Sequence, residues 1–234
     1  MTAVLGALVA PGISRLSGAL TDAAATASYI LAHETSVRLG WTLGLISTAG
    51  YVVLITLFYQ LFRPVSRSLT MVAVFLGLMG CALTASGSLF LLAPLVILKG
   101  SPYLSVFDAK QVQALALMFL NLNVQLSSIA LVFFGLFQLM LGYLIFRSMF
   151  LPRVFGVLIA LAGVGWLTAL WPPLENALLS PIEVLGFVAE AALMLWLLVM
   201  GVKPQRWMER AHETGASGGR QPRSSMGQGP DSDS

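Results

Sequence analysis

The sequence predicts an all-α protein, a polytopic transmembrane helical bundle with five full spans and a short N-terminal span, six in all. Hydrophobic residues make up 57% of the chain and charged residues only 10%, with a mean hydropathy of +0.86. Soluble domains contain about 45–50% and about 25% of these classes. In addition, Ala109–Arg147 runs without a proline through an apolar stretch that can cross a ~30 Å hydrocarbon core as one helix. The 234 residues accommodate about six spans of ~20 residues.

Charge and cysteine content argue against two other classes of protein. The net charge is only +3, and the pattern contains no basic face with interleaved aromatic residues, so we expect no nucleic-acid partner. Cys81 is the only cysteine of the chain and lies in an apolar run. No intramolecular disulfide can therefore form, and we interpret Cys81 as a small packing residue.

The chain begins with two short segments. Met1–Ile13 is apolar but too short to span a bilayer alone, so we expect it to be the latter part of a first membrane helix whose start lies upstream. Thr21–Glu34 is rich in alanine and begins with Thr21 and Asp22, two residue types that cap helix N-termini. It is too short and too polar to span, which predicts a short helix at the membrane surface.

Two full spans follow, Val37–Phe62 and Ser68–Leu98, and the second is long enough to tilt or to bend at Pro94. Each carries small residues at every fourth position, which favour close approach of another helix. These are Gly40, Gly44 and Thr48 in the first span and Gly80, Thr84 and Ser88 in the second.

The long helix predicted for Ala109–Arg147 carries polar and small residues at helical spacing. They are Asn121, Gln125, Ser128, Gly135, Gln138 and Gly142. Spacings of three, four and seven residues place side chains on one arc of a helix. We expect this arc to face protein rather than lipid.

Two further spans complete the predicted bundle. Pro152 and Trp171-Pro172-Pro173 bracket the next span, in which Gly156 and Ala160 form a small-residue pair. Pro181 is predicted to start the last span. The final segment is dominated by Gly, Ser, Arg, Gln and Pro without apolar periodicity. We therefore predict one transmembrane bundle over 1–207 and a disordered cytoplasmic tail over 208–234.

Basic residues are distributed unequally between the two ends of the predicted bundle. Nine lie on one side: Arg63, Arg67, Arg147, Arg153, Lys203, Arg206, Arg210, Arg220 and Arg223. Four lie on the other: Arg15, Arg38, Lys99 and Lys110. Cytoplasmic loops carry an excess of Lys and Arg. We therefore expect a cell (inner or plasma) membrane protein whose nine-residue side, with the C-terminus, faces the cytoplasm.

Several segments together resemble the bacterial membrane family known as domain of unknown function 4386. They are AHETSVRLG (32–40), LFRPVSRSL (61–69), VFFGLFQLMLGYLIFRSMFLPRVFGVLIALAG (132–163) and EAALMLWLLVMGV (190–202). The likeness runs from about Asp22 to Trp207 and implies a multi-pass helical protein of prokaryotic type, but no activity. This chain departs from the family in its shorter first span. It also has Phe137 after Phe-Phe-Gly-Leu, where members often have a histidine.

Glu190 is the most informative single residue, because a carboxyl group within a span is costly to expose to lipid. Glu183 and Gly186 precede it by seven and four residues, on the same helix face. One interpretation is an ion or proton site, or a counter-charge for a ligand. The other is a structural carboxyl, neutral or hydrogen-bonded to the amides of 121–128, with Arg38 as an alternative counter-charge.

Other polar residues offer weaker signals. Asn121, Asn123 and Gln125 could line a cavity or act as hydrogen-bonded links between helices. His33-Glu34 resembles a fragment of a metallopeptidase motif, but no second histidine follows at the required spacing. We therefore expect no metal site and no cofactor.

These patterns predict an integral membrane protein that acts by binding or interaction, without catalysis. The sequence shows no mid-span lysine, phosphate-binding glycine loop or buried Ser/His pair. The expected partners are the lipid bilayer and either a second copy of the chain or another membrane protein. The alternative is a small proton- or ion-coupled transporter that uses Glu190. A solvent-lined cavity that reaches Glu190 would favour transport, and a dry bundle would favour binding or interaction.

Overall fold

The computed structural model describes residues 22–100, 106–148 and 150–200. The predicted N-terminal span over Met1–Ile13 and the predicted tail over 208–234 lie outside the described residues. The regular elements of the described part are all helices. They are α3 (Ala23–Ala32), α4 (Glu34–Phe62), α5 (Arg67–Leu98), α6 (Ala109–Arg147), α7 (Arg153–Trp166), the 3-10 turn η2 (Leu167–Leu170) and α8 (Pro172–Val199).

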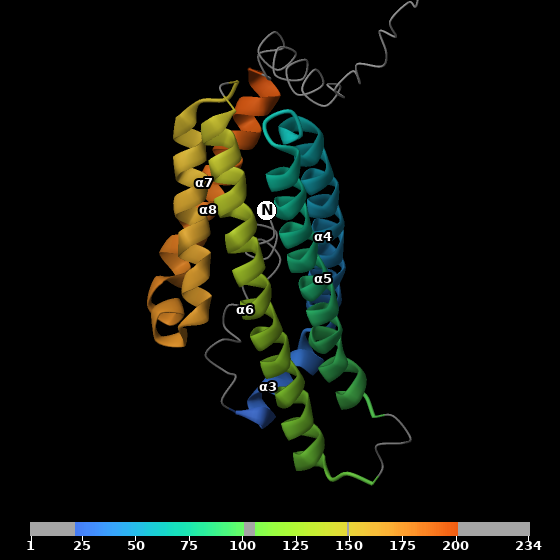
Figure 1. Ribbon diagram of the computed structural model, residues 1–234. Helices are drawn as coiled ribbons and strands as arrows, with labels where there is room; N and C mark the ends of the chain where they lie inside the picture. Colours follow the sequence, from blue (N-terminus) through green and yellow to red (C-terminus); the bar gives the residue numbers. More distant parts are fainter. Residues whose placement is uncertain (1–21, 101–105, 149, 201–234) are drawn as a thin grey trace, which may run out of the picture.

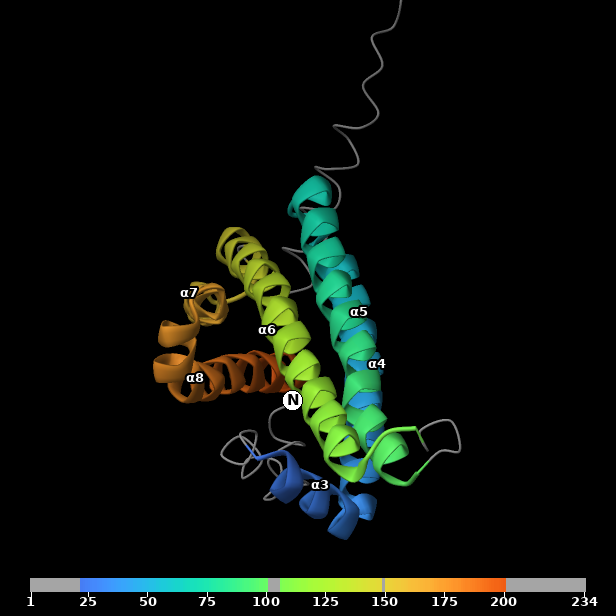
Figure 2. The same ribbon diagram turned by 90° about the horizontal axis from the view of Figure 1, so that it is seen from below.

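Helix α6 is the centre of the arrangement. It packs against α5 on one side and against α7 on the other, while α4 packs on α5 and α8 packs on α7. Figure 1 shows α4, α5 and α6 as long neighbouring helices, and Figure 2 shows α7 and α8 on the opposite side of α6 from α4. The short helix α3 lies across the end of the bundle at which α4 and α6 begin. The prediction of a short, non-spanning helix here is confirmed.

Four helical segments of the described ranges are long and apolar enough to cross a membrane: α4, α5, α6, and α7 together with η2. The apolar stretch Val184–Val199 within α8 is shorter than these four segments. The all-helical, multi-span class is therefore as predicted, and the total of six spans stays a prediction.

The predicted start of the last helix at Pro181 is wrong. The helix begins at Pro172, and Pro181 lies inside it. Pro172 and Pro173 occupy the first turn, where a missing backbone N–H leaves no helical hydrogen bond unmade. Pro181 removes one hydrogen bond from the helix interior, a loss that membrane helices tolerate where neighbouring groups satisfy the freed carbonyl.

Local side chains explain where α6 begins. Asp108 accepts a hydrogen bond from the backbone N–H of Gln111 at 2.8 Å, and the Gln111 side chain accepts one from the backbone N–H of Asp108 at 3.0 Å. This reciprocal capping box satisfies two of the four unpaired N–H groups at a helix start. The helix then continues over 39 residues to Arg147, with the bounds that the apolar pattern predicted.

Glycines bring the backbones of α6 and α7 into direct contact. A methyl group added to Gly142 would lie 2.6 Å from the carbonyl oxygen of Gly156, and one added to Gly135 would lie 2.9 Å from that of Gly163. Only a residue without a side chain fits at such distances. The close approach predicted at Gly44 is not seen among the described helices, because none of their atoms lies within 4 Å of the position its methyl group would occupy.

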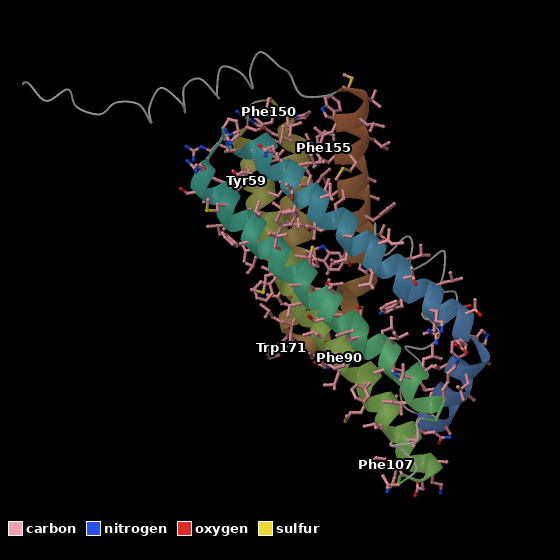
Figure 3. The ribbon with its side chains drawn as sticks, turned by 90° about the vertical axis from the view of Figure 1, so that its right-hand side faces the viewer. Tyr59, Phe90, Phe107, Phe150, Phe155 and Trp171 are labelled. Carbon is pink, nitrogen blue, oxygen red and sulfur yellow. The ribbon has the colours of Figure 1, made fainter. Side chains whose placement is uncertain are left out.

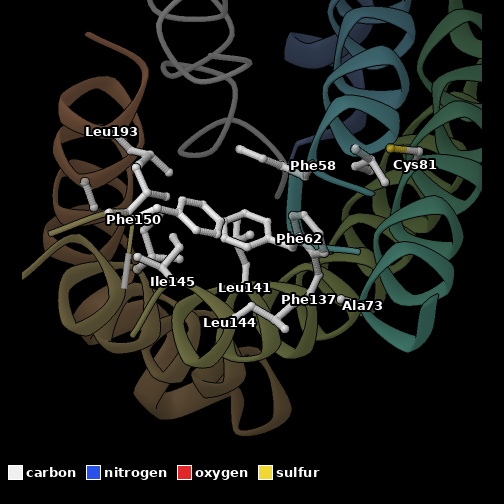
Figure 4. Close-up of a cluster of buried hydrophobic side chains, with 14 residues drawn as sticks. Phe58, Phe62, Ala73, Cys81, Phe137, Leu141, Leu144, Ile145, Phe150 and Leu193 are labelled. Atoms are coloured by element: carbon white, nitrogen blue, oxygen red, sulfur yellow. The ribbon is translucent and has the colours of Figure 1, made fainter. Parts of the chain in front are cut away.

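The main apolar core fills the bundle on the side of the α4–α5 turn. Its largest fully buried members come from four helices: Ile55 and Phe62 on α4, Phe137, Leu144 and Ile145 on α6, Ile159 on α7, and Leu193 on α8. Figure 4 shows Phe62 and Phe150 facing each other in this cluster, and their ring centroids are 5.9 Å apart. Burial of this apolar surface stabilises the packing of α4, α6 and α7 against one another.

Aromatic and basic side chains lie toward both ends of the bundle. Figure 3 shows Tyr59 and Phe150 near the end where α4 turns into α5, and Phe107 at the opposite end. The basic residues of the described ranges follow the same division. Arg63, Arg67, Arg147 and Arg153 lie at one end, and Arg38, Lys99 and Lys110 lie toward the other. The described members of the two groups used to predict orientation are therefore at opposite ends of the bundle.

Candidate functional site

Three polar side chains from three helices meet in the middle of the bundle. The side-chain N–H of Gln138, on α6, donates to Glu190 Oε1, on α8, at 2.7 Å. The hydroxyl of Tyr51, on α4, donates to the same oxygen at 3.2 Å. Glu190 therefore points into the bundle, and one of its oxygens links α4 and α8, which lie on opposite sides of α6 (Figure 2).

Packing around these side chains keeps them oriented. Gln138 is 3% exposed, which buries its amide almost completely. The Tyr51 ring meets the Phe134 ring edge to face, with centroids 5.4 Å apart. One turn further along α4, Ile55 is fully buried and continues the same face. The three polar groups thus lie on rigid helices rather than on loops.

A cavity of about 220 Å³ adjoins this polar centre. The wall includes Thr48 and Tyr51 from α4, Cys81 and Thr84 from α5, Ser127, Ala130, Leu131, Phe134 and Gln138 from α6, Trp166 from α7, and Gly186, Phe187 and Glu190 from α8. Cys81, predicted to be a small packing residue, is indeed buried. The cavity thus lies at the junction of all five long helices.

Most hydroxyl groups in the wall already donate to the backbone of their own helix. Thr48 donates to the carbonyl of Gly44 at 2.9 Å, Thr84 to that of Gly80 at 2.9 Å, and Ser127 to that of Asn123 at 2.8 Å. In contrast, the side-chain carbonyl oxygen of Gln138 is buried and has no hydrogen-bond partner among the described residues. Glu190 Oε2 likewise accepts no hydrogen bond in this part of the chain. Apart from the second N–H of the Gln138 amide, the free polar groups of the polar centre are therefore acceptors.

The cavity has a closed end at Glu190. Thr48, Ser127 and Trp166 line one part of the cavity, and Tyr51, Gln138 and Glu190 line the end nearest the apolar core. Beyond them, a much smaller space of about 10 Å³ is enclosed by apolar side chains, including Leu54, Phe58, Leu141 and Leu193. That volume is close to the space one water needs. The polar centre therefore separates the cavity from the apolar core.

The structure divides the predicted polar arc of α6. Gly135, Gln138 and Gly142 are buried, Ser128 is half-buried, and Asn121 and Gln125 are exposed. The expectation that Asn121 and Gln125 face protein is wrong. Seventeen residues separate Asn121 from Gln138, and at ~100° per residue this places them about 100° apart around the helix.

Asn121 and Asn123 also differ from each other. The Asn121 amide donates to the carbonyl of Leu117 in its own helix at 3.1 Å. The Asn123 amide donates across to the carbonyl of Gly87 on α5 at 2.8 Å. Of the two interpretations offered for these amides, Asn123 fits the link between helices.

Two other charged residues were predicted to belong to the site, Arg38 and Glu183. Arg38 donates to Glu34 at 2.9 Å, and Lys99 pairs with the same carboxylate at the end of the bundle. Arg38 is therefore not the counter-charge of Glu190. Glu183 belongs to α8, but its side chain lies outside the described residues.

His33 has a local structural role between α3 and α4. Its ring stacks on that of Tyr29, with centroids 4.2 Å apart, and its Nδ1 lies 3.1 Å from the Tyr29 carbonyl oxygen. Within the described ranges, no three His, Cys, Asp or Glu side chains gather into a group that could hold a metal ion.

Comparison with known proteins identifies the family. The family model for the domain of unknown function DUF4386 matches residues 2–201. The chain belongs to the DUF4386 family. Neither the curated proteins nor the solved structures gave a match. The resemblance noted from the sequence is thus confirmed.

One position that the sequence resemblance singled out lies beside the site. Phe137, where a histidine was expected from the resemblance, is buried, and its ring centroid is 6.3 Å from that of Tyr51. In this DUF4386 protein the position adds an apolar ring to the core next to the polar centre.

Two important wall residues were missed from the sequence. Tyr51 was missed because it donates to a residue 139 positions away, which periodicity within one helix cannot reveal. A tyrosine in the middle of an apolar span was the available signal, because its hydroxyl needs a partner there. Trp166 gave no such signal, since tryptophan is also common at membrane interfaces.

Proposed function

We propose that this DUF4386 protein is an integral membrane protein that binds a small molecule in the cavity ending at Glu190, without catalysing a reaction. The observation that carries the proposal is the polar centre at the closed end of the cavity. A buried acceptor without a partner, such as the Gln138 carbonyl oxygen, is unfavourable in an apolar interior, and a ligand that donates hydrogen bonds would satisfy it together with Glu190 Oε2.

A purely structural role accounts for only part of this geometry. A carboxyl that only joins helices would be expected to use both oxygens and to have its space filled by neighbouring side chains. Here both donors converge on Oε1, while Oε2 and the Gln138 carbonyl oxygen accept no hydrogen bond from the residues that the structure describes. The cavity beside them is also far larger than one water needs. Both features favour a site that is completed by a ligand.

The proposed location follows from the charges at the two ends of the bundle. We place the protein in the inner or plasma membrane of a prokaryotic cell, with the Arg63 and Arg147 end and the C-terminus in the cytoplasm. In that orientation the cavity extends from the middle of the membrane toward the outer surface. A ligand would then enter from the outer aqueous phase or from the outer leaflet.

A cavity-filling variant tests the binding function. Ser127 is exposed and lines the cavity, whereas Gln125 is exposed on the same helix and does not line it. A panel of small amines, alcohols and carboxylates would be screened for an increase in the melting temperature of the purified full-length protein, because a ligand of the native state stabilises it by mass action. Compounds that stabilise the wild type should fail on Ser127→Phe and still act on Gln125→Phe. Stabilisation that survives Ser127→Phe would refute binding in this cavity.

A proton- or ion-coupled transporter is the second candidate, and one observation favours it specifically. The cavity reaches the carboxyl group of Glu190, and a transporter needs such a route to a carboxyl in the middle of the membrane. A carrier would have to open the apolar closure around Phe58 and Leu193 so that Glu190 could be reached from the other side. Counterflow of a stabilising ligand in proteoliposomes, with and without a pH gradient, tests this. Gradient-driven uptake lost in Glu190→Gln, with unchanged melting temperature, would favour the carrier over the binding protein.

A further inference from the structure

We infer that the ligand of this cavity is a small organic ammonium ion with an apolar, ring-sized body. This inference rests on the proposed binding function and adds the chemical class of the ligand. It follows from the hydrogen-bonding balance of the wall, the lack of a basic side chain among the described residues that line the cavity, and the size of the cavity.

The first argument is the balance of donors and acceptors. One N–H of the Gln138 amide and the Tyr51 hydroxyl are both used by Glu190 Oε1, and the threonine and serine hydroxyls of the wall donate to their own helices. Apart from the second N–H of that amide, the open positions at the closed end are Glu190 Oε2 and the Gln138 carbonyl oxygen. An ammonium group, which has only donors, matches this pair, whereas a carboxylate or phosphate ligand would place acceptor against acceptor.

The indole of Trp166 adds one further N–H donor to the residues that line the cavity. Trp166 belongs to α7, away from the closed end that Tyr51, Gln138 and Glu190 form. One neutral donor there does not reverse the preference set by a carboxylate and an amide oxygen at the closed end. It would suit a ligand that also carries a hydroxyl or ether oxygen on its far side.

The second argument is charge. Seven basic residues occur in the described ranges: Arg38, Arg63, Arg67, Lys99, Lys110, Arg147 and Arg153. None of them lines the cavity, and the ion pairs of the described part are both made by Glu34. An ionised Glu190 therefore has no protein counter-charge among these residues. A cationic ligand would supply it, in surroundings where an isolated charge is costly.

The third argument is size and shape. A cavity of about 150 Å³ lined by apolar side chains holds one benzene molecule. The cavity here measures about 220 Å³, so it accommodates one ring with a short arm rather than a bare metal ion. The rings of Tyr51, Phe134, Trp166 and Phe187 form part of its wall. Aromatic faces attract cations as well as apolar bodies, which favours an ammonium ion over a neutral amide or alcohol of equal size.

Three probes with the same 2-phenylethyl body separate the classes of ligand. The 2-phenylethylammonium ion carries the proposed cation, 2-phenylethanol is its neutral match, and 3-phenylpropionate is its anionic match. Binding to the purified full-length protein would be measured by calorimetry at neutral pH. We expect the ammonium ion to bind at least about tenfold more tightly than the alcohol, corresponding to about 1.4 kcal/mol. The carboxylate should not bind detectably.

Variants then assign the preference to Glu190. Glu190→Gln should reduce the ammonium affinity about tenfold or more and leave that of the alcohol unchanged. The matched control is Glu34→Gln, which removes a carboxylate outside the cavity and should change neither. If Glu190→Gln does not fold, the three probes on the wild type and on Ser127→Phe still decide.

The possible results distinguish this inference from the function on which it rests. Equal binding of the alcohol and the ammonium ion, or tighter binding of the carboxylate, would overturn the ammonium inference. If that binding is abolished by Ser127→Phe but not by Gln125→Phe, the cavity still binds small molecules and the proposed function stands. Binding of all probes that is insensitive to Ser127→Phe would overturn both.

Discussion

Replacing Glu190 by leucine removes the shared acceptor of two hydrogen bonds that join three helices. Gln138 and Tyr51 lose a partner at 2.7 Å and 3.2 Å, and the Gln138 amide is 3% exposed. Hydrogen bonds inside membrane proteins contribute about 0.6 kcal/mol on average and up to about 1.7 kcal/mol. Two of them predict a loss of about 1–2 kcal/mol in unfolding free energy. Glu190→Gln keeps a side-chain oxygen at the same position and should lose far less.

The measurement is reversible unfolding in mixed micelles by titration with a denaturing detergent, for the wild type and both Glu190 variants. A double-mutant cycle with Gln138→Leu isolates the shorter bond, and its coupling energy should lie between about 0.5 and 1.7 kcal/mol. Gln125→Leu is the control, because the Gln125 amide is exposed and makes no hydrogen bond with Glu190. A Glu190→Leu variant as stable as the wild type would refute the reasoning. So would a Glu190→Gln variant that loses as much stability as Glu190→Leu.

Three further predictions concern packing, capping and orientation. Gly142→Ala should destabilise the bundle by about 1–3 kcal/mol, because its methyl group would lie 2.6 Å from a backbone oxygen of α7; Gly44→Ala, with open space around it, should be neutral in the same unfolding assay. Asp108→Ala should cost about 0.5–2 kcal/mol through loss of the α6 cap and should increase amide hydrogen exchange in the first turn of α6, whereas unchanged exchange would contradict the capping role. In intact cells, an impermeant thiol reagent should label Lys110→Cys and not Arg147→Cys, and the reverse pattern would invert the proposed orientation.

The helices were predictable from the sequence where a local signal coincided with the apolar pattern. Asp108 and Gln111 mark the start of α6, Arg147 marks its end, and the predicted bounds match the structure. Asp22 likewise caps α3, where its side chain accepts from the backbone N–H of Ala24. Pro181 misled the prediction because a proline can either start a helix or lie within one, and the choice depends on the preceding residues and on tertiary contacts.

The site was predictable only in part, and the reason is geometric. Burial of Glu190 within the bundle could be expected from the cost of a carboxyl in lipid. Its partners could not be assigned, because a helix of 39 residues rotates many times and only part of its length is covered by α7 and α8. Gln138 lies in the covered part and Asn121 does not. The contribution of Tyr51 depends on how α4 and α8 are placed, which no single helix encodes.

The glycine contacts between α6 and α7 also determine which parts of the bundle can be displaced. Where backbones touch without intervening side chains, one helix cannot slide along the other unless their carbonyl groups first separate. We therefore expect α6 and α7 to move as one rigid unit, which includes Gln138. Widening of the cavity then has to come from tilting of α4, α5 or α8 relative to this unit. An outward tilt of α4 would break the 3.2 Å contact of Tyr51 while leaving the 2.7 Å contact of Gln138 in place.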